Sequence, residues 1–183
     1  MVRIVAGTLG GRRLKLRVPA GVRPTTERLR EALFSILESM MALEGTSWLD
    51  LFGGSGAVGF EAISRGASSV VYNDCNASLV DQVRKQALVL GITDRMRWYA
   101  VEALGCLDRL RDDEFTIVFL DPPYRYTGFE ELGRRLPSAR FVVVESTSEV
   151  TLGPRWRVCW WRRYGDTRLG LFEPVEHEGQ EVR

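Results

Sequence analysis

The chain predicts one α/β domain built on a mostly parallel, seven-stranded sheet with helices on both faces. Apolar runs typical of buried strands alternate with amphipathic runs typical of helices, and such crossovers are what parallel strands require. The last two strand-like segments have no helix between them, so they form a hairpin that leaves one C-terminal strand antiparallel. With 183 residues, 45% of them hydrophobic, the chain is long enough for a substantial core.

The elements follow one another in a regular order. Residues 2–6 and 12–18 alternate apolar and polar side chains around a glycine-rich turn, which predicts an N-terminal β-hairpin. Pro24-Thr25 starts a helix after a linker, and its apolar stripe is Leu29, Leu33, Ile36, Leu37 and Met40. The remaining segments are strand 47–51, helix 57–65, strand 69–73, helix 77–90, strand 96–100, helix 103–111, strand 115–120, helix 128–135, strand 140–145 and the hairpin strands 155–163 and 167–173.

A glycine-rich turn follows the first strand of the sheet, in the sequence Asp50-Leu-Phe-Gly-Gly-Ser-Gly56. Glycine tolerates positive φ and allows a ligand to approach the backbone closely. Such a turn alone is also compatible with a dinucleotide site. However, Asp50 precedes the glycines, where its charge would repel a pyrophosphate and attract an ammonium group. S-adenosylmethionine (AdoMet) carries such an ammonium group and no phosphate.

The tetrapeptide Asp121-Pro-Pro-Tyr124 follows the apolar strand 115–120. It therefore lies where α/β proteins place their chemistry, outside the carboxyl end of a strand. The prolines stiffen the turn and carry no N–H donors. A carboxylate, a fixed carbonyl and an aromatic ring can then hold a flat heterocycle by its exocyclic amino group. The alternative is an ordinary proline-rich turn that Asp121 caps.

Together these motifs resemble a known family, the bacterial methyltransferases that modify N2 of a guanine in 16S ribosomal RNA. The resemblance covers about residues 2–173 and implies a Rossmann-like class I methyltransferase fold. It also includes the segments Arg3-Ile-Val-Ala-Gly7, Gly10-Gly-Arg-Arg-Leu14, Arg23-Pro-Thr-Thr26, Arg28-Leu-Arg-Glu-Ala-Leu-Phe34, Ser64-Arg-Gly-Ala67 and Arg163-Tyr-Gly-Asp-Thr-Arg-Leu169. The implied domains are a basic hairpin arm over 1–23, a methyltransferase domain over 24–173 and a polar tail over 174–183.

The resemblance implies AdoMet as the methyl donor and S-adenosylhomocysteine as the product. The implied catalytic residues are Asp121, Pro122 and Tyr124, with the Asp121 carboxylate and the Pro122 carbonyl on the amino group and Tyr124 stacked on the base. The implied cofactor-binding residues are Asp50, Phe52, Gly53, Gly54, Ser55, Gly56, Asp74, Cys75, Glu102, Ala103 and Asp121.

Three cofactor positions depart from the family pattern. Asp74 stands where the family has Glu and is expected at the ribose hydroxyls, with Asn73 as the competing candidate. Glu102 stands where Asp is usual and is expected with Ala103 at the adenine. Either acid can instead be a helix N-cap. Gly53 replaces a commoner Ala, a change expected only to loosen the turn.

Positive charge is concentrated at the start of the chain. The first thirty residues carry eight basic side chains against Glu27 as the single acid, whereas residues 31–150 carry 11 basic and 18 acidic ones. Such asymmetry indicates a basic arm for phosphates on an acidic catalytic body. The alternative is that the arginines only solubilise a hairpin. The predicted RNA-binding residues are Arg3, Arg12, Arg13, Lys15, Arg17 and Arg23.

The rest of the chain indicates a cytoplasmic protein. No apolar run is long enough to cross a bilayer, and no signal peptide is recognisable. Cys75, Cys106 and Cys159 are far apart, and His177 lies in the polar tail, so we expect neither disulfides nor a metal. We expect a monomer, and the resemblance implies a partly assembled small ribosomal subunit as its substrate. The alternatives are another nucleic acid, including adenine N6 of DNA, or a non-catalytic assembly factor that binds AdoMet.

Overall fold

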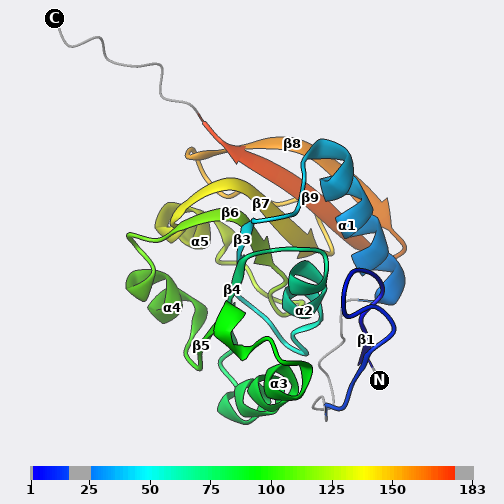
Figure 1. The fold of residues 1–183 in the computed structure, drawn as a ribbon. Helices are drawn as coiled ribbons and strands as arrows, with labels where there is room; N and C mark the ends of the chain where they lie inside the picture. The colour runs from blue at the N-terminus through cyan, green and yellow to red at the C-terminus, as the bar shows by residue number, and fades with distance from the viewer. Residues whose placement is uncertain (1, 17–25, 176–183) are drawn as a thin grey trace, which may run out of the picture.

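The computed structural model describes residues 2–16 and 26–175. A seven-stranded sheet with the order β5-β4-β3-β6-β7-β9-β8 runs through its centre (Figure 1). Within the described residues β9 alone runs against the other strands of this sheet, because it pairs antiparallel with both β7 and β8. The predicted mostly parallel sheet with one antiparallel C-terminal strand is confirmed. The strands are β3 (Ser47–Asp50), β4 (Ser69–Asn73), β5 (Met96–Tyr99), β6 (Glu114–Leu120), β7 (Ser138–Ser146), β8 (Trp156–Tyr164) and β9 (Thr167–Pro174).

Helices cover the two faces of the sheet and enclose two separate cores. Side chains of α1 (Glu27–Met40), α2 (Ala57–Ser64) and α3 (Ala77–Leu90) pack into one core. Those of α4 (Ala103–Arg109) and α5 (Phe129–Arg135) pack into the other. Strand residues alternate between the cores, since Val143 of β7 belongs to the first and its neighbour Val144 to the second. A 3₁₀ turn, η1 (Thr93–Arg95), precedes β5.

Helix α1 begins one residue later than predicted. Its N-cap is Thr26, whose hydroxyl accepts a hydrogen bond from the Leu29 N–H at 3.2 Å, and Thr25 lies outside the described residues. The stripe prediction is wrong at one position, because Met40 is 40% exposed. Arg30, counted in sequence as part of a basic surface, is instead buried at 1% exposure. Arg30 lies one helical turn before the buried Leu33 and Phe34, so its side chain shares their core-facing side of α1.

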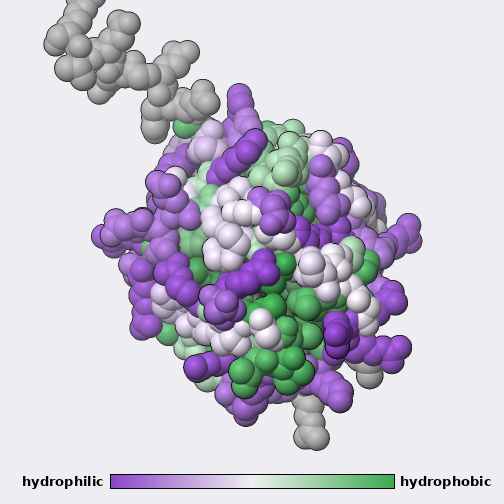
Figure 2. All heavy atoms as spheres, in the orientation of Figure 1, coloured by the Kyte–Doolittle hydropathy of each residue, from purple (hydrophilic) through white to green (hydrophobic). Residues whose placement is uncertain are grey.

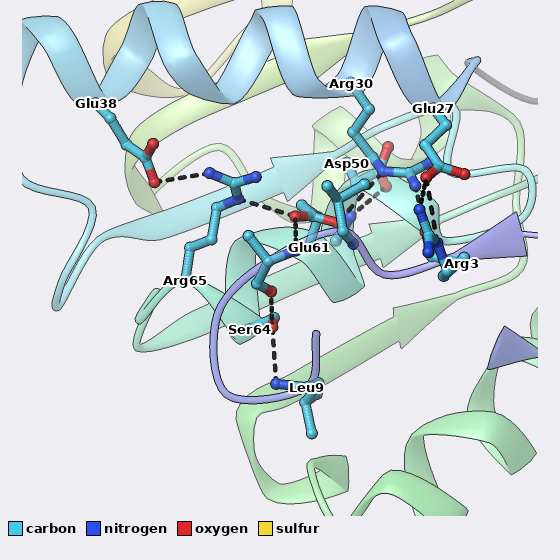
Figure 3. A network of polar contacts seen from close by, with 12 residues as sticks. Arg3, Leu9, Glu27, Arg30, Glu38, Asp50, Glu61, Ser64 and Arg65 are labelled. Atoms are coloured by element: carbon cyan, nitrogen blue, oxygen red, sulfur yellow. Dashed lines mark hydrogen bonds and ion pairs between the residues drawn. The ribbon is translucent and has the colours of Figure 1, made fainter. Parts of the chain in front are cut away.

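The N-terminal hairpin is shorter than predicted and is packed against α2 (Figures 1 and 3). Its strands are β1 (Val2–Arg3) and β2 (Arg13–Leu14). The N–H groups of Val5 and Ala6 donate to the Glu61 carboxylate at 2.7 and 3.0 Å, so they do not extend the ladder. Hydrophobic side chains fix the hairpin further, because Val2, Ile4 and Leu14 are all buried.

On the face drawn in Figure 2, hydrophilic side chains surround a smaller hydrophobic area in the lower part of the view. Over the described stretches of the chain, no helix is both long and apolar enough to span a membrane.

Candidate active site at the carboxyl edge of the sheet

A cleft of about 1110 Å³ opens at the carboxyl ends of the central strands. The segments after β3, β4 and β6 supply its walls, although they lie up to seventy residues apart in sequence. The predicted site residues that line this cleft are Asp50, Phe52, Gly53, Gly54, Ser55, Asp74, Cys75, Glu102, Ala103, Asp121, Pro122 and Tyr124. The fold thus brings the two sequence motifs into one space.

The glycine-rich turn holds its shape through a tyrosine on the next strand. A Cβ atom at Gly53 would lie 2.1 Å from the ring of Tyr72, which is fully buried. The Tyr72 hydroxyl donates to the Gly54 carbonyl at 2.7 Å, and burial raises the pKa of this phenol, so it stays a donor. The expectation that Gly53 only loosens the turn was therefore wrong. Gly53 is required by its contact with Tyr72.

Gly54 and Gly56 both have positive φ, at 51° and 70°. Gly54 lines the cleft, whereas Gly56 lies behind the turn, where a Cβ would meet the Val83 side chain at 2.7 Å. Of the cofactor-binding residues predicted from sequence, Gly56 is the one that does not line the cleft. Glycine is needed at position 56 because of its positive φ and because a Cβ atom there would clash with Val83 of α3.

Asp50 is a buried acid at the end of β3, with 1% exposure. Its Oδ2 accepts a hydrogen bond from the Gly59 N–H in the first turn of α2 at 3.3 Å. Burial raises the pKa of Asp50 to about 7, against the lowering effect of this hydrogen bond. Ionising a buried carboxyl group is costly, and a nearby cation compensates this cost. A carboxyl group with a raised pKa on the wall of a cleft therefore favours a cationic ligand group.

Asp74 and Asn73 occupy different places at the end of β4. Asn73 is the last strand residue, buried at 1% exposure, and its side-chain amide donates to the Leu51 carbonyl at 2.9 Å. The Asp74 carboxylate accepts from the Gly54 N–H at 3.0 Å and the Asn76 N–H at 2.8 Å. A carboxylate has about four acceptor positions, so Asp74 retains capacity for ligand hydroxyls. This geometry favours Asp74 over Asn73.

Glu102 and Ala103 begin α4 on the far wall of the cleft. Glu102 takes the N-cap position, but its side chain makes no capping hydrogen bond. The Ala103 N–H belongs to the first turn of the helix, where backbone donors have no partner within the helix. Cys75 is exposed and is a free thiol on the same wall.

The Asp121–Tyr124 segment closes the cleft on the other side. Asp121 and Pro122 follow β6 directly, and the Tyr124 side chain is 62% exposed. The Pro123 carbonyl accepts from the Tyr126 N–H at 2.8 Å and so holds the turn. Tyr126 packs edge-on against Phe52 of the glycine-rich segment, with ring centroids 5.6 Å apart. An aromatic contact thus links the glycine-rich segment to the loop that follows Asp121–Tyr124.

The sequence reasoning missed several residues of the cleft. These come from the start of α1, from the turn between β8 and β9 and from the end of β7, and they include Thr26, Arg28, Arg163, Asp166, Thr167 and Glu145. Glu145 had a usable signal, because it follows the apolar run 141–144 as Asp121 follows its own strand. The α1 and hairpin residues reach the cleft through long-range packing, which no local pattern reveals.

Buried ion pairs attach the predicted basic surface to the domain (Figure 3). Glu61 is fully buried and receives Arg65 Nε at 2.9 Å and Arg30 Nε at 3.4 Å, besides the two hairpin N–H groups. Burial lowers the pKa of Arg30 against the effect of Glu61. Arg30 and Arg65 therefore hold the fold. Arg3 forms an ion pair with Glu27 at the start of α1, and both side chains of this pair are exposed.

The remaining predicted RNA-binding residues are solvent-facing where the structure describes them. Arg12, Arg13 and Lys15 are exposed on the hairpin. The Lys15 N–H donates to the Gln86 side chain at 3.0 Å, which brings this surface to α3. Arg17 and Arg23 lie outside the described residues.

Comparisons with known proteins match nearly the whole chain. Residues 2–173 match the family described as Conserved hypothetical protein 95. YlbH of Bacillus subtilis is 31% identical over 159 residues, covering 82% of this chain and 85% of YlbH. Ribosomal RNA small subunit methyltransferase D of Haemophilus influenzae is 35% identical over 134 residues, covering 71% of this chain and 67% of that protein. The solved structure of yhhF from Escherichia coli aligns with a TM-score of 0.80 at 31% identity, covering 94% and 97% of the two chains.

Proposed function

Since this chain belongs to the Conserved hypothetical protein 95 family and has a Rossmann-like methyltransferase fold, we propose that it methylates 16S rRNA with AdoMet. The finer proposal is transfer to the exocyclic N2 amino group of one guanosine, on a partly assembled small subunit in the cytoplasm. Its relative from Haemophilus influenzae is named as a small-subunit rRNA methyltransferase, which supports rRNA as the substrate. The observation that carries the proposal is the single cleft that joins the glycine-rich turn to Asp121–Tyr124.

The residues of the cleft fit AdoMet group by group. The buried Asp50 suits the ammonium group, and the remaining acceptor positions of Asp74 suit the ribose hydroxyls. Glu102 and the Ala103 N–H suit the edge of the adenine. A cleft of about 1110 Å³ has room for both this ligand and a flipped base. When bound, AdoMet supplies an electrophilic methyl group.

The protein contributes orientation and proton acceptance. The lone pair of guanine N2 is delocalised into the ring, so the amino group is a weak nucleophile. Asp121 and the Pro122 carbonyl would accept its two hydrogens and hold the nitrogen in line with the methyl group. Asp121 would then take the proton that leaves, directly or through water. The exposed ring of Tyr124 would stack on the base and exclude water.

Kinetics of an Asp121 variant tests this assignment. Asp121→Ala should lower kcat by about a hundredfold or more while AdoMet affinity changes little, because Asp121 contacts the reacting amino group. Tyr124→Ala should lower kcat and weaken RNA binding together, because it removes the stacking surface. Transfer of a radiolabelled methyl group gives kcat, and calorimetry gives the AdoMet affinity.

A matched control is Asp112→Ala, which removes an exposed acid from the loop before β6. This variant should keep the wild-type kcat. Wild-type turnover in both Asp121→Ala and Tyr124→Ala would remove the tetrapeptide from the active site.

A further inference from the structure

Glu145 occupies the place next to Asp121 at the edge of the sheet. Strands β6 and β7 pair in parallel with Leu120 opposite Val144, so Asp121 and Glu145 are the next residues in register. Both residues line the 1110 Å³ cleft, and both also line a second cavity of about 350 Å³. The second cavity lies against the same Asp121–Tyr124 segment, on the side of the β7 carboxyl end.

Alternation along the strands puts both carboxylates on one face of the sheet. Phe119 and Val143 pack into the core beneath α1–α3, whereas Leu120 and Val144 pack into the opposite core. Two residues beyond Phe119 and Val143 come Asp121 and Glu145, and side chains at i and i+2 share a face. Neighbouring strands lie about 4.8 Å apart, so the two side chains start within reach of one small molecule.

Guanine and adenine differ at the ring nitrogen N1 beside the amino group, where a second acid would make contact. Guanine carries N2 with two hydrogens and, beside it, an N1–H donor. Adenine carries an amino group beside an N1 lone pair, which an ionised carboxylate repels. A carboxylate accepts hydrogen bonds and donates none. With Asp121 and the Pro122 carbonyl on the amino group, a second acid at this edge would select the base whose ring nitrogen carries hydrogen.

We propose that Glu145 accepts the N1–H of the target guanine and so makes the site specific for guanine over adenine. This inference rests on the proposed function, because it assumes that Asp121 and Pro122 hold the N2 amino group. In this proposal a residue of β7 determines which base is methylated, because the Asp-Pro-Pro-Tyr segment alone does not distinguish guanine from adenine. A site built to bind a donor discriminates strongly against an analogue that lacks the donor, because its own polar group then stays unpaired.

The test compares two substrates that differ at N1 and C6. Small-subunit rRNA is prepared with guanosine or 2-aminopurine at the methylated position; 2-aminopurine keeps the 2-amino group and lacks both the N1 hydrogen and O6. The Glu145→Gln variant isolates the part of the preference that depends on N1. The wild type should prefer guanosine by about tenfold or more in kcat/KM. Glu145→Gln should lower kcat/KM for guanosine by about tenfold and leave the 2-aminopurine value unchanged or higher, because its amide can donate to N1.

Controls separate specificity from folding. Glu149→Gln makes the same charge change at an exposed position four residues on and should keep the wild-type preference. Glu145→Asp keeps the acid and should retain the preference for guanosine at a reduced rate. AdoMet affinity, measured by calorimetry, should be equal in all variants that fold.

Two results would overturn the inference. An equal fall for both substrates in Glu145→Gln would assign Glu145 a purely structural role, while N2 transfer by the wild type would leave the proposed function intact. A guanosine preference that stays at the wild-type value in Glu145→Gln would show that the acid does not select the base. Failure of the wild type to methylate N2 of guanosine would instead overturn the proposed function, and this inference with it.

Discussion

Asp50 shows most clearly how a buried acid of the cleft lowers the stability of the fold when it ionises, while its charge can serve ligand binding. Burial raises its pKa to about 7, far above the value of about 3.9 for an unfolded chain. The folded protein therefore binds this proton more tightly than the unfolded one does. Asp50 favours folding below about pH 4, and that contribution is lost as the pH rises to about 7.

The AdoMet affinity should depend on pH through the same group. In the proposed site the ammonium group of AdoMet pairs with ionised Asp50, so affinity should rise by about fivefold to tenfold between about pH 6 and pH 7.5. Asp50→Asn should bind AdoMet more weakly and without this rise. The same variant should unfold at higher temperature than the wild type near pH 8, because it buries no charge. Calorimetry and thermal unfolding across this range measure both effects, and a pH-independent wild-type affinity would remove Asp50 from the ammonium site.

At the scale of elements, β3, β4 and the glycine-rich turn form one packed unit. Gly53→Ala places a methyl group into the buried Tyr72 ring, so the turn or the ring must move. We expect a lower melting temperature and weaker AdoMet binding, with a cost of about 1–3 kcal/mol typical of overpacking. A second change, Tyr72→Val, makes room and should restore part of both quantities. Additive losses in the double variant, measured by thermal unfolding and calorimetry, would contradict the direct contact.

Local patterns predicted the regular elements well. The predicted bounds of β4 and α3, 69–73 and 77–90, coincide with the observed ones, because each carries an unbroken apolar periodicity between clear end signals. The hairpin was predicted too long, since Val5 and Ala6 donate to Glu61, 55 or more residues away. No alternation in a short segment reveals such a partner.

The site could be predicted from sequence where an acidic residue ends or directly follows an apolar strand. Asp50, Asp74 and Asp121 each end or follow an apolar strand, and all three line the cleft. Glu145 follows the same rule and was overlooked because no familiar motif surrounds it. Arg30 was misjudged for the opposite reason, since its charge is visible in sequence and its burial against Glu61 is not.

At the scale of the whole molecule, the basic hairpin sits beside the cleft. Arg3 pairs with Glu27 at the start of α1, and the next residue, Arg28, lines the cleft. We propose that the exposed Arg12, Arg13 and Lys15 continue this surface and contact rRNA phosphates. The proposed unit 1–23 is thus packed on the methyltransferase domain in its described part, through Glu61 and α2.

Replacing Arg12, Arg13 and Lys15 with alanine should reduce the salt dependence of RNA binding. Each phosphate contact contributes about 0.7–0.9 to the slope of log affinity against log salt, so losing three should lower it by about 2–3. AdoMet affinity should be unaffected. A matched control replaces Arg109, Arg111 and Arg140, exposed residues outside the hairpin. Filter binding to naked rRNA and to subunit particles measures the slopes, and an unchanged slope in the hairpin variant would leave these residues a role in solubility alone.

In the proposed reaction, one cleft places the methyl donor and a guanine amino group together. Small-subunit particles incubated with the protein and AdoMet, digested to nucleosides and analysed by mass spectrometry, test it most directly. We expect N2-methylguanosine at a single position, formed about a hundredfold or more slowly with Asp121→Ala. N6-methyladenosine, or no methylated nucleoside with the wild-type protein, would contradict it.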